Sequence, residues 1–471
     1  MRNKFLILIT GCAVTFAACE KVLDTEPKQA ISAEGALTSI SGVKGLLTSV
    51  YDNMQGSSYY GRDLIIQSEV LSDNARITVS NSNRFVNESN NTIRAHFDDF
   101  DLSFQMINKL NLVIDNVDAT TDAGTAEKAK VKGEALFLRG LIYFNLVNEY
   151  GYNPKHIQGT FDLGVPLVLK GVSGASQVTY PSRAKVADIY TQVKKHVADA
   201  IVLLENSGSK VVPSKAAAQA LLSRVALYNG DWQEAADRAT DAINSGAATF
   251  VNTGTVAGYQ SIFHQKLSPE SLFELNYETN ESLTSNSLQG IYQEVNGSGY
   301  GDVVPQNNFL ALYEPGDVRK NAVLTDMVKA GEPVSRVTKY SGAGGVFGAD
   351  NVRILRISEM YLNRAEAYAR LGGASNEALA QADVNLIRNR AGLPATNLVG
   401  SALIDLILKE RRIELAFEGH RWFDLVRLGS DIVKENSTSS FTVPFSDPRI
   451  LAPIPQAQLD INKNLVQNPG Y

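Results

Sequence analysis

The segment 410–429, ERRIELAFEGHRWFDLVRLG, places charged side chains where a buried helix would carry apolar ones. The residues before it set an apolar stripe at Leu403 and Ile407, and helical spacing carries that stripe on to Glu410. An ionised group taken out of water costs several kcal/mol unless it is paired and hydrogen-bonded. The segment therefore constrains the fold, because its charges need partners inside the protein.

Candidate partners lie within the segment itself, three residues apart on one helical face. The pairs are Arg411 with Glu414, Glu418 with Arg421, and Asp424 with Arg427. With Glu410, they predict a helix that docks through a ladder of ion pairs. We interpret this ion-pair motif as architectural and not catalytic, because structural networks perturb charged groups as readily as active sites do.

The N-terminus has the pattern of an export signal. A basic start precedes an apolar run at residues 5–18, which is too short to span a bilayer comfortably and ends in small residues before Cys19. Ala17-Ala18-Cys19 resembles a lipobox, so we expect residues 1–18 to be removed and Cys19 to be lipidated. Cys12 also sits in a lipobox-like sequence, but it would leave a hydrophobic region of only about seven residues.

Composition limits the classes of partner. The chain has 471 residues, of which 44% are hydrophobic and 20% charged, as in ordinary globular proteins. Its formal net charge of -6 becomes -8 when the two basic residues of the leader are removed, leaving 42 basic and 50 acidic residues. This charge excludes a nucleic-acid partner, because neutralising phosphates needs a basic surface.

Helical periodicity dominates the pattern of apolar residues. The expected helices span residues 41–54, 104–117, 126–150 and 188–204, followed by two helical hairpins at 215–244 and 354–390. In the first hairpin, Gly230-Asp231 separates a Leu- and Tyr-bearing helix from an Ala-rich one, which resembles a tetratricopeptide repeat. The sequence therefore predicts a mainly α-helical protein.

Two segments lack this periodicity. Residues 249–351 hold glycine-rich clusters and scattered aromatic residues, and we expect loops with a few short strands there. Because helices flank this segment, we interpret it as an insertion within a single domain, residues 19–471. Residues 72–91 are rich in Asn, Ser and Asp, and long loops of this kind are usually functional or disordered.

Several short motifs occur in order along the chain. They are VLDTEP at 22–27, EALFLR at 134–139, GVPL at 164–167, DVR at 317–319, RISEMYLNRAEA at 356–367, LAPIP at 451–455 and QNPGY at 467–471. With the segment 410–429, these motifs make the mature chain resemble the SusD/RagB family of outer-membrane nutrient-binding lipoproteins along nearly its whole length.

The resemblance implies a fold and a role. The fold is a mainly all-α superhelix of tetratricopeptide-like helix pairs with a loop-rich ligand-binding face. The role is that of a lipid-anchored outer-membrane protein, facing the cell exterior, that captures oligosaccharide and passes it to a SusC-like TonB-dependent β-barrel transporter. It implies neither a catalytic residue nor a cofactor.

Sugar chemistry points to candidate ligand-binding residues. Sugars present apolar C–H faces to aromatic rings and hydroxyl groups to Asn, Asp and Arg. Both tryptophans lie in helical motifs, so the aromatic platform is expected to be Tyr or Phe. The candidates in loops are Tyr59, Tyr60, Asp73, Asn74, Arg84, Phe85, Tyr292 and Tyr300.

Catalytic and metal-binding patterns are weak. The histidines are dispersed, and His420 with Asp424 could face one metal only at the expense of the ion-pair motif, so we expect no metal site. Asp98, Asp99 and Asp101 could supply the two carboxylates of a glycosidase, although an acidic helix start explains them more simply. A glycoside hydrolase, and a tetratricopeptide scaffold that binds protein or peptide, are the two alternative functions.

Overall fold

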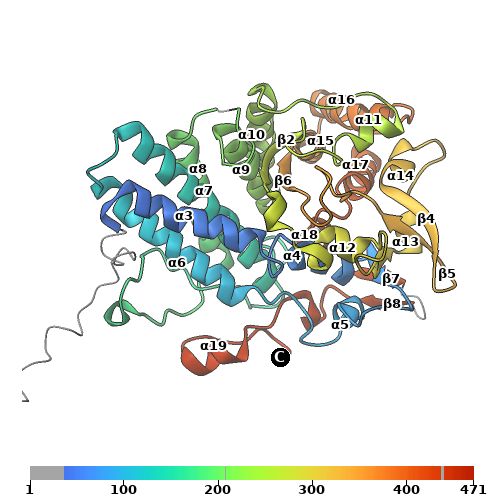
Figure 1. Ribbon diagram of the computed structural model, residues 1–471. Helices are drawn as coiled ribbons and strands as arrows, with labels where there is room; N and C mark the ends of the chain where they lie inside the picture. The colour runs from blue at the N-terminus through green and yellow to red at the C-terminus, as the bar shows by residue number, and fades with distance from the viewer. Residues whose placement is uncertain (1–36, 207, 436–439) are drawn as a thin grey trace, which may run out of the picture.

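The computed structural model describes residues 37–206, 208–435 and 440–471. Cys12, Cys19 and the predicted export signal lie outside the described residues. Long helices dominate the described part of the chain (Figure 1). They are α3 (Ile40–Gln55), α6 (Phe100–Asn116), α7 (Thr125–Tyr150), α8 (Val186–Leu203), α9 (Lys215–Asn229), α10 (Trp232–Asn244), α15 (Ile357–Leu371), α16 (Ala374–Arg390) and α17 (Gly400–Glu414).

Helix α3 illustrates how the sequence dictates these elements. Its residues at helical spacing, Val43, Leu47, Val50 and Met54, are buried on one face. The hydroxyl group of Ser39 accepts a hydrogen bond from the backbone N–H of Gly42 and so caps the first turn. Periodicity and capping together place the helix within one residue of the predicted span at each end.

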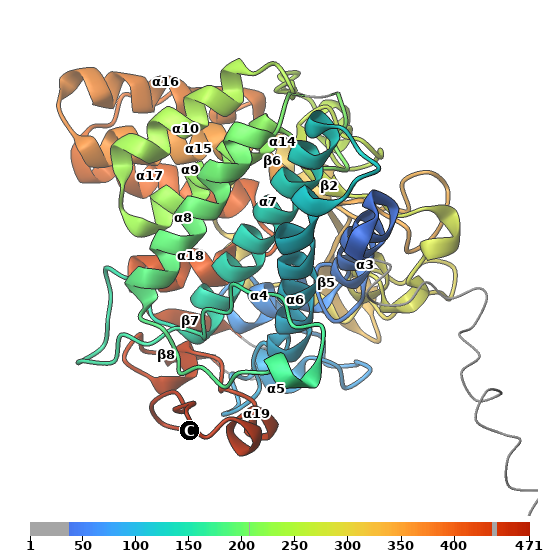
Figure 2. The same cartoon turned by 90° about the vertical axis from the view of Figure 1, so that its left-hand side faces the viewer.

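The two predicted hairpins form neighbouring helix pairs, and Figure 2 shows them side by side. Gly230 ends α9 with a φ of 76°, a left-handed conformation that favours glycine. Helix α10 buries four alanines and packs against both α9 and α15, because small side chains permit close approach. The second hairpin begins later than expected: residues 354–356 belong to strand β6 (Val352–Arg356), and its first helix starts at Ile357.

Short elements fill the rest of the described chain. The described strands form four two-stranded antiparallel sheets, β1–β3, β2–β6, β4–β5 and β7–β8. The other strands are β1 (Ala75–Ile77), β2 (Ser271–Leu275), β3 (Val303–Pro305), β4 (Leu324–Lys329), β5 (Glu332–Val337), β7 (Ile432–Glu435) and β8 (Ser440–Val443). The short helices are α4 (Asp63–Leu71), α5 (Val86–Ser89), α11 (Val256–Gln260), α12 (Leu288–Tyr292), α13 (Asn307–Leu310), α14 (Val318–Val323), α18 (Arg421–Leu428) and α19 (Gln456–Ile461).

One large cluster of buried apolar side chains extends from Ile40 to Ile454 and so joins both ends of the described chain. Within 249–351 no helix is longer than six residues, in keeping with the loop-rich pattern of its sequence. None of the helices in the described ranges is both long enough and apolar enough to span a membrane. Figures 1 and 2 place α5 and the C-terminal α19 on the same lower edge of the molecule, and residues of α5 and of the segment that leads into α19 line the candidate site.

Candidate functional site

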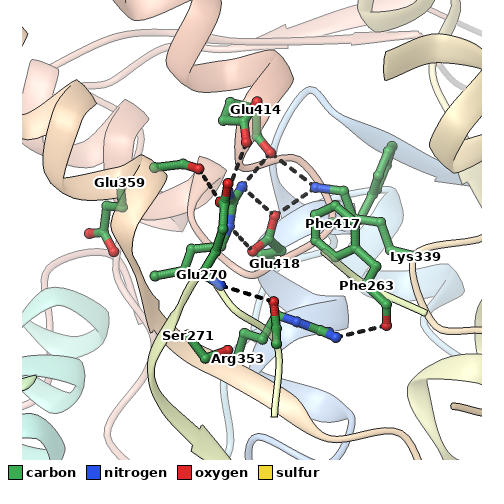
Figure 3. Close-up of polar contacts among 12 residues, drawn as sticks. Phe263, Glu270, Ser271, Lys339, Arg353, Glu359, Glu414, Phe417 and Glu418 are labelled. Carbon is green, nitrogen blue, oxygen red and sulfur yellow. Dashed lines mark hydrogen bonds and ion pairs between the residues drawn. The ribbon is translucent and has the colours of Figure 1, made fainter. Parts of the chain in front are cut away.

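The ion-pair motif lies inside the protein and holds elements together. One oxygen of Glu414 is 2.7 Å from Arg356 Nη1 and 2.6 Å from Arg390 Nη2. Burial opposes ionisation of Glu414, but the neighbouring guanidinium groups outweigh it and hold its pKa well below the usual range. Glu418 lies 2.6 Å from Lys339 Nζ, and Figure 3 shows these two side chains pointing toward one another.

The partners differ from those that the spacing predicts. Only the third pair forms, with Arg427 Nε donating to Asp424 at 2.7 Å. Arg411 instead lies 2.9 Å from Asp424. For Glu418 and Arg421 the reason is that α17 ends at Glu414 and the chain turns between them, with Phe417 at φ 66° and Gly419 at φ 86°. Arg411 and Glu414 both lie in α17, but each meets a partner outside that helix, so the predicted ladder of pairs within the segment was wrong.

Two candidate ligand-binding residues belong to this internal network. Asp73 accepts from Arg421 Nε at 2.6 Å, and Asn74 accepts from Arg412 Nε at 2.8 Å. Asp73 is 5% exposed and Asn74 is fully buried. Their polar groups are thus satisfied within the protein, and burial removes them from the surface that a ligand can reach.

Three candidate tyrosines lie in the core. Tyr59 and Tyr60 are buried, and the amide nitrogen of Asn145 is 3.0 Å from both phenol oxygens. Tyr292 is also buried, and its ring stacks on that of Tyr340 with the centroids 5.9 Å apart. None of the three rings offers a free face to solvent. Aromatic residues beside loops are therefore poor indicators of a binding platform when the loop folds inward.

Two of the three remaining candidates line one surface hollow of about 510 Å³, which is within the range of small-ligand sites. We call it the Phe85 hollow. Its lining includes Arg62, Asp63, Arg84, Phe85, Glu88, Arg94, His96, Phe97, Asp98 and the segment 453–456. Arg84 and Phe85 are the two predicted ligand residues in this lining. By contrast, an enclosed cavity beside His420 holds about 30 Å³, too small for a sugar.

Backbone strain concentrates in the wall of the Phe85 hollow. Of the nine described non-glycine residues with positive φ, four lie between 83 and 94. They are Asn83, Phe85, Asn91 and Arg94, with φ between 45° and 71°. Such a conformation costs about 1–2 kcal/mol per residue and recurs at ligand sites, where it aims side chains. Here two of the strained residues, Phe85 and Arg94, carry side chains that line the hollow.

The eighth candidate, Tyr300, supports the hollow from behind Arg84. The Arg84 guanidinium carbon lies 4.0 Å from the centre of the Tyr300 ring, a cation–π contact. Lys329, at the end of β4, donates to the Tyr300 carbonyl at 2.7 Å and to Asp302 Oδ1 at 2.8 Å. Asp302 in turn accepts from the backbone N–H of Ser82 at 3.0 Å. These bonds tie the loop that bears Arg84 to the loop that bears Tyr300.

Acidic groups of the hollow differ in their partners. Arg62 donates two hydrogen bonds to Asp63, at 2.6 and 3.1 Å. Burial, together with the charge of Asp63, raises the pKa of Glu88, and burial with the charges of Asp101 and Asp63 raises that of Asp98. Burial lowers the pKa of His96 to about 3, so this ring stays neutral at physiological pH. The lining thus offers hydrogen-bond acceptors and donors next to an aromatic ring.

The candidate metal ligands and glycosidase carboxylates differ in their burial and in their partners. The part of the chain that the structure describes contains no group of three His, Cys, Asp or Glu side chains able to hold a metal ion. Asp424 is engaged by Arg411 and Arg427, and burial keeps the pKa of His420 well below its usual value. Asp99 is buried and accepts a hydrogen bond from Ser103, whereas Asp98 is exposed.

Sequence reasoning missed most residues of the hollow as ligand-binding candidates. Arg62, Glu88 and Arg94 carry no spacing signal that separates them from other surface charges, and residues 453–456 lie more than 350 positions away from them. The one usable signal was the Asn- and Ser-rich stretch at 72–91, whose length and composition indicate a functional loop.

Comparisons with known proteins agree with this architecture. Residues 334–471 match a family model described as the SusD family, and residues 21–227 match one described as starch-binding associating with outer membrane. SusD-like protein P2 of Formosa agariphila is 25% identical over the full length of both chains. The starch-binding protein SusD of Bacteroides thetaiotaomicron is 29% identical over 153 residues, covering 30% of this chain and 24% of that one.

Solved structures give the same result. A SusD superfamily protein of Bacteroides thetaiotaomicron has a TM-score of 0.81 and 28% identity, covering 92% of this chain and 100% of the other. A SusD superfamily protein of Bacteroides vulgatus has a TM-score of 0.79 and 25% identity, covering 92% and 99%. Because two family models, full-length relatives and solved structures all agree, the chain belongs to the SusD family.

Proposed function

We propose that this protein binds glycan in the Phe85 hollow and delivers it to an outer-membrane transporter. The observation that carries the proposal is the lining of the hollow, where a partly buried phenylalanine lies among guanidinium and carboxylate groups. Sugars need this combination, because their C–H faces stack on rings while their hydroxyl groups bond to charged side chains. A relative named starch-binding protein and a family model described as starch-binding support it.

The membrane part of the proposal rests on the same family model, which is described as associating with the outer membrane. We place the chain there through a lipid on Cys19, as a single domain from 19 to 471 that faces the cell exterior. Its partner is a SusC-like TonB-dependent β-barrel transporter. Labelling with a radioactive fatty acid should mark the wild type and Cys12→Ala but not Cys19→Ala. Label on Cys19→Ala would assign the lipid elsewhere.

The glycan claim is tested by calorimetric titration of the purified protein against an oligosaccharide panel. Phe85→Ala should weaken the tightest binding by about three- to tenfold, because stacking contributes about 1 kcal/mol. Tyr180→Ala is the matched control, since Tyr180 is 51% exposed and lies outside the hollow. Equal losses in both variants, or no binding to any glycan, would contradict the proposal.

Two further assays separate the alternatives. Incubation of the protein with each glycan that it binds should leave the glycan intact. A cleavage product that forms with the wild type but not with the Glu88→Gln, Asp98→Asn double variant would establish a glycosidase, since both carboxylates line the hollow. Affinity purification from outer membranes should recover a β-barrel transporter. Recovery of such a barrel without any glycan binding would favour the protein-binding scaffold.

A further inference from the structure

Two arginines of the Phe85 hollow are unlike all others in the described chain. Every other described arginine side chain donates a hydrogen bond or makes an ion pair with the protein. Arg84 and Arg94 do neither within the described residues, and both line the hollow. Their donors are therefore available to a ligand.

Both guanidinium groups rest on aromatic rings. Arg84 lies 4.0 Å from the centre of the Tyr300 ring, and Arg94 lies 6.0 Å from that of Tyr471. A ring contacts the flat face of the guanidinium and leaves the N–H groups at its edge free. These edges match the two oxygens of a carboxylate or of a sulfate ester. The tyrosines thus hold two cations in place without consuming their donors.

The other charged residues of the lining narrow the chemical class of ligand that fits the hollow. Arg62 is engaged by Asp63, so it adds no free cation. Glu88 and Asp98 make no ion pair with the described residues, and they line the same hollow. These carboxylates repel a simple anion but accept hydrogen bonds from hydroxyl groups. A fitting ligand therefore carries an acidic group and hydroxyl groups in one molecule.

From this arrangement we infer that the Phe85 hollow selects acidic oligosaccharides. Arg84 and Arg94 bind the carboxylate of a uronic acid or a sulfate ester, while Glu88 and Asp98 bind neighbouring hydroxyl groups. This inference rests on the proposed glycan binding and adds the substrate class. It predicts that a neutral glycan of the same linkage binds more weakly, since the two guanidinium groups then lack an anionic partner.

The test titrates the protein with pairs of oligosaccharides that differ only in the acidic group. Uronate oligomers are compared with their carboxyl-reduced forms, and sulfated oligomers with their desulfated forms, so the two sources of charge are distinguished. In at least one pair the acidic member should bind about tenfold tighter, the value of one charge-assisted hydrogen bond. Raising NaCl from 50 to 500 mM, concentrations chosen for the assay, should shrink that advantage.

Variants connect the preference to the arginines. Arg84→Gln and, separately, Arg94→Gln should lower the ratio of acidic to neutral affinity by about tenfold, and Arg84→Lys should lower it less because the charge remains. Lys195→Gln, which removes one exposed charge on α8, should leave the ratio unchanged. Thermal melts check that each variant is folded. The second arginine variant keeps the test open if the first fails to fold.

The outcomes separate this inference from the proposed function. Neutral members that bind as tightly as acidic ones, or a ratio that neither arginine variant changes, would overturn the acidic preference and leave glycan binding intact. Binding to no member of any pair would overturn both. Binding of inorganic sulfate alone with comparable affinity would overturn the role of the hydroxyl groups.

Discussion

Replacing Glu414 with glutamine should lower the free energy of unfolding by about 3–5 kcal/mol, the usual cost of leaving a buried charge unpaired. The buried cluster around Glu414 is balanced. It contains five cations and five anions: Arg319, Arg356, Arg388, Arg390 and Lys339 with Asp317, Glu270, Glu410, Glu414 and Glu418. Glutamine keeps the shape of the side chain but leaves one positive charge without compensation.

The dependence on pH follows from the depressed pKa of Glu414, which the surrounding arginines produce against the effect of burial. A lowered folded pKa contributes stability that is fully present above the unfolded value of about 4.5 and is lost as pH falls through the folded value. The difference between wild type and Glu414→Gln should therefore be constant from about pH 6 to 8 and shrink in strong acid.

Urea denaturation followed by circular dichroism measures this difference without adding salt. For a chain of 471 residues the entropy of unfolding is about 1 kcal/mol per kelvin, so the melting temperature should fall by about 3–5 °C. Glu127→Gln is the control, because Glu127 pairs with Lys44 at the surface and such pairs contribute at most about 1 kcal/mol. A Glu414→Gln variant within 1 kcal/mol of wild type would refute the reasoning.

Three more predictions concern other groups. Burial lowers the pKa of Lys434 to about 7, so between pH 7 and 10.5 the unfolded chain holds a proton on this lysine that the folded chain has lost. Wild-type stability should therefore rise with pH across this window, and Lys434→Met should flatten the rise. An unchanged slope in urea titrations would count against this prediction. Burial raises the pKa of Glu69 to about 7, so between pH 4.5 and 7 the folded chain holds a proton that the unfolded chain has lost, and stability should fall as pH rises. Glu69→Gln should remove this fall. A fall that persists in the variant, measured by the same urea titrations, would contradict the prediction. Lys329→Met should weaken glycan binding several-fold with little change in melting temperature, because Lys329 holds the Tyr300 loop. Val328→Thr, at an exposed neighbouring position, should leave glycan binding unchanged. Equal losses of binding in the two variants would exclude a positioning role for Lys329.

Local patterns predicted the helices well and their charge partners poorly. Helix α3 and the α9–α10 hairpin follow from periodicity, caps and Gly230, all of which act within a few residues. The partners of Glu414, in contrast, come from β6 and from the end of α16. A charged residue signals only that it needs a partner, and the tertiary fold decides which one it meets.

The candidate site was predictable only in part for the same reason. Arg84 and Phe85 stood out as a cation beside an aromatic residue in a polar loop, and the structure places both in the hollow. Asp73 has a similar polar setting in the sequence, but in the structure it lies in the interior, where it pairs with Arg421. Arg94 had no distinguishing neighbours, since its support comes from Tyr471 at the far end of the chain.

The most direct test of the central claim is a crystal structure of the protein with the tightest-binding oligosaccharide from the panel. We expect a sugar ring against Phe85, with an acidic group near the free edges of Arg84 and Arg94. Density for the glycan at another surface, such as the groove formed by residues 167–181, with the Phe85 hollow empty, would contradict the account.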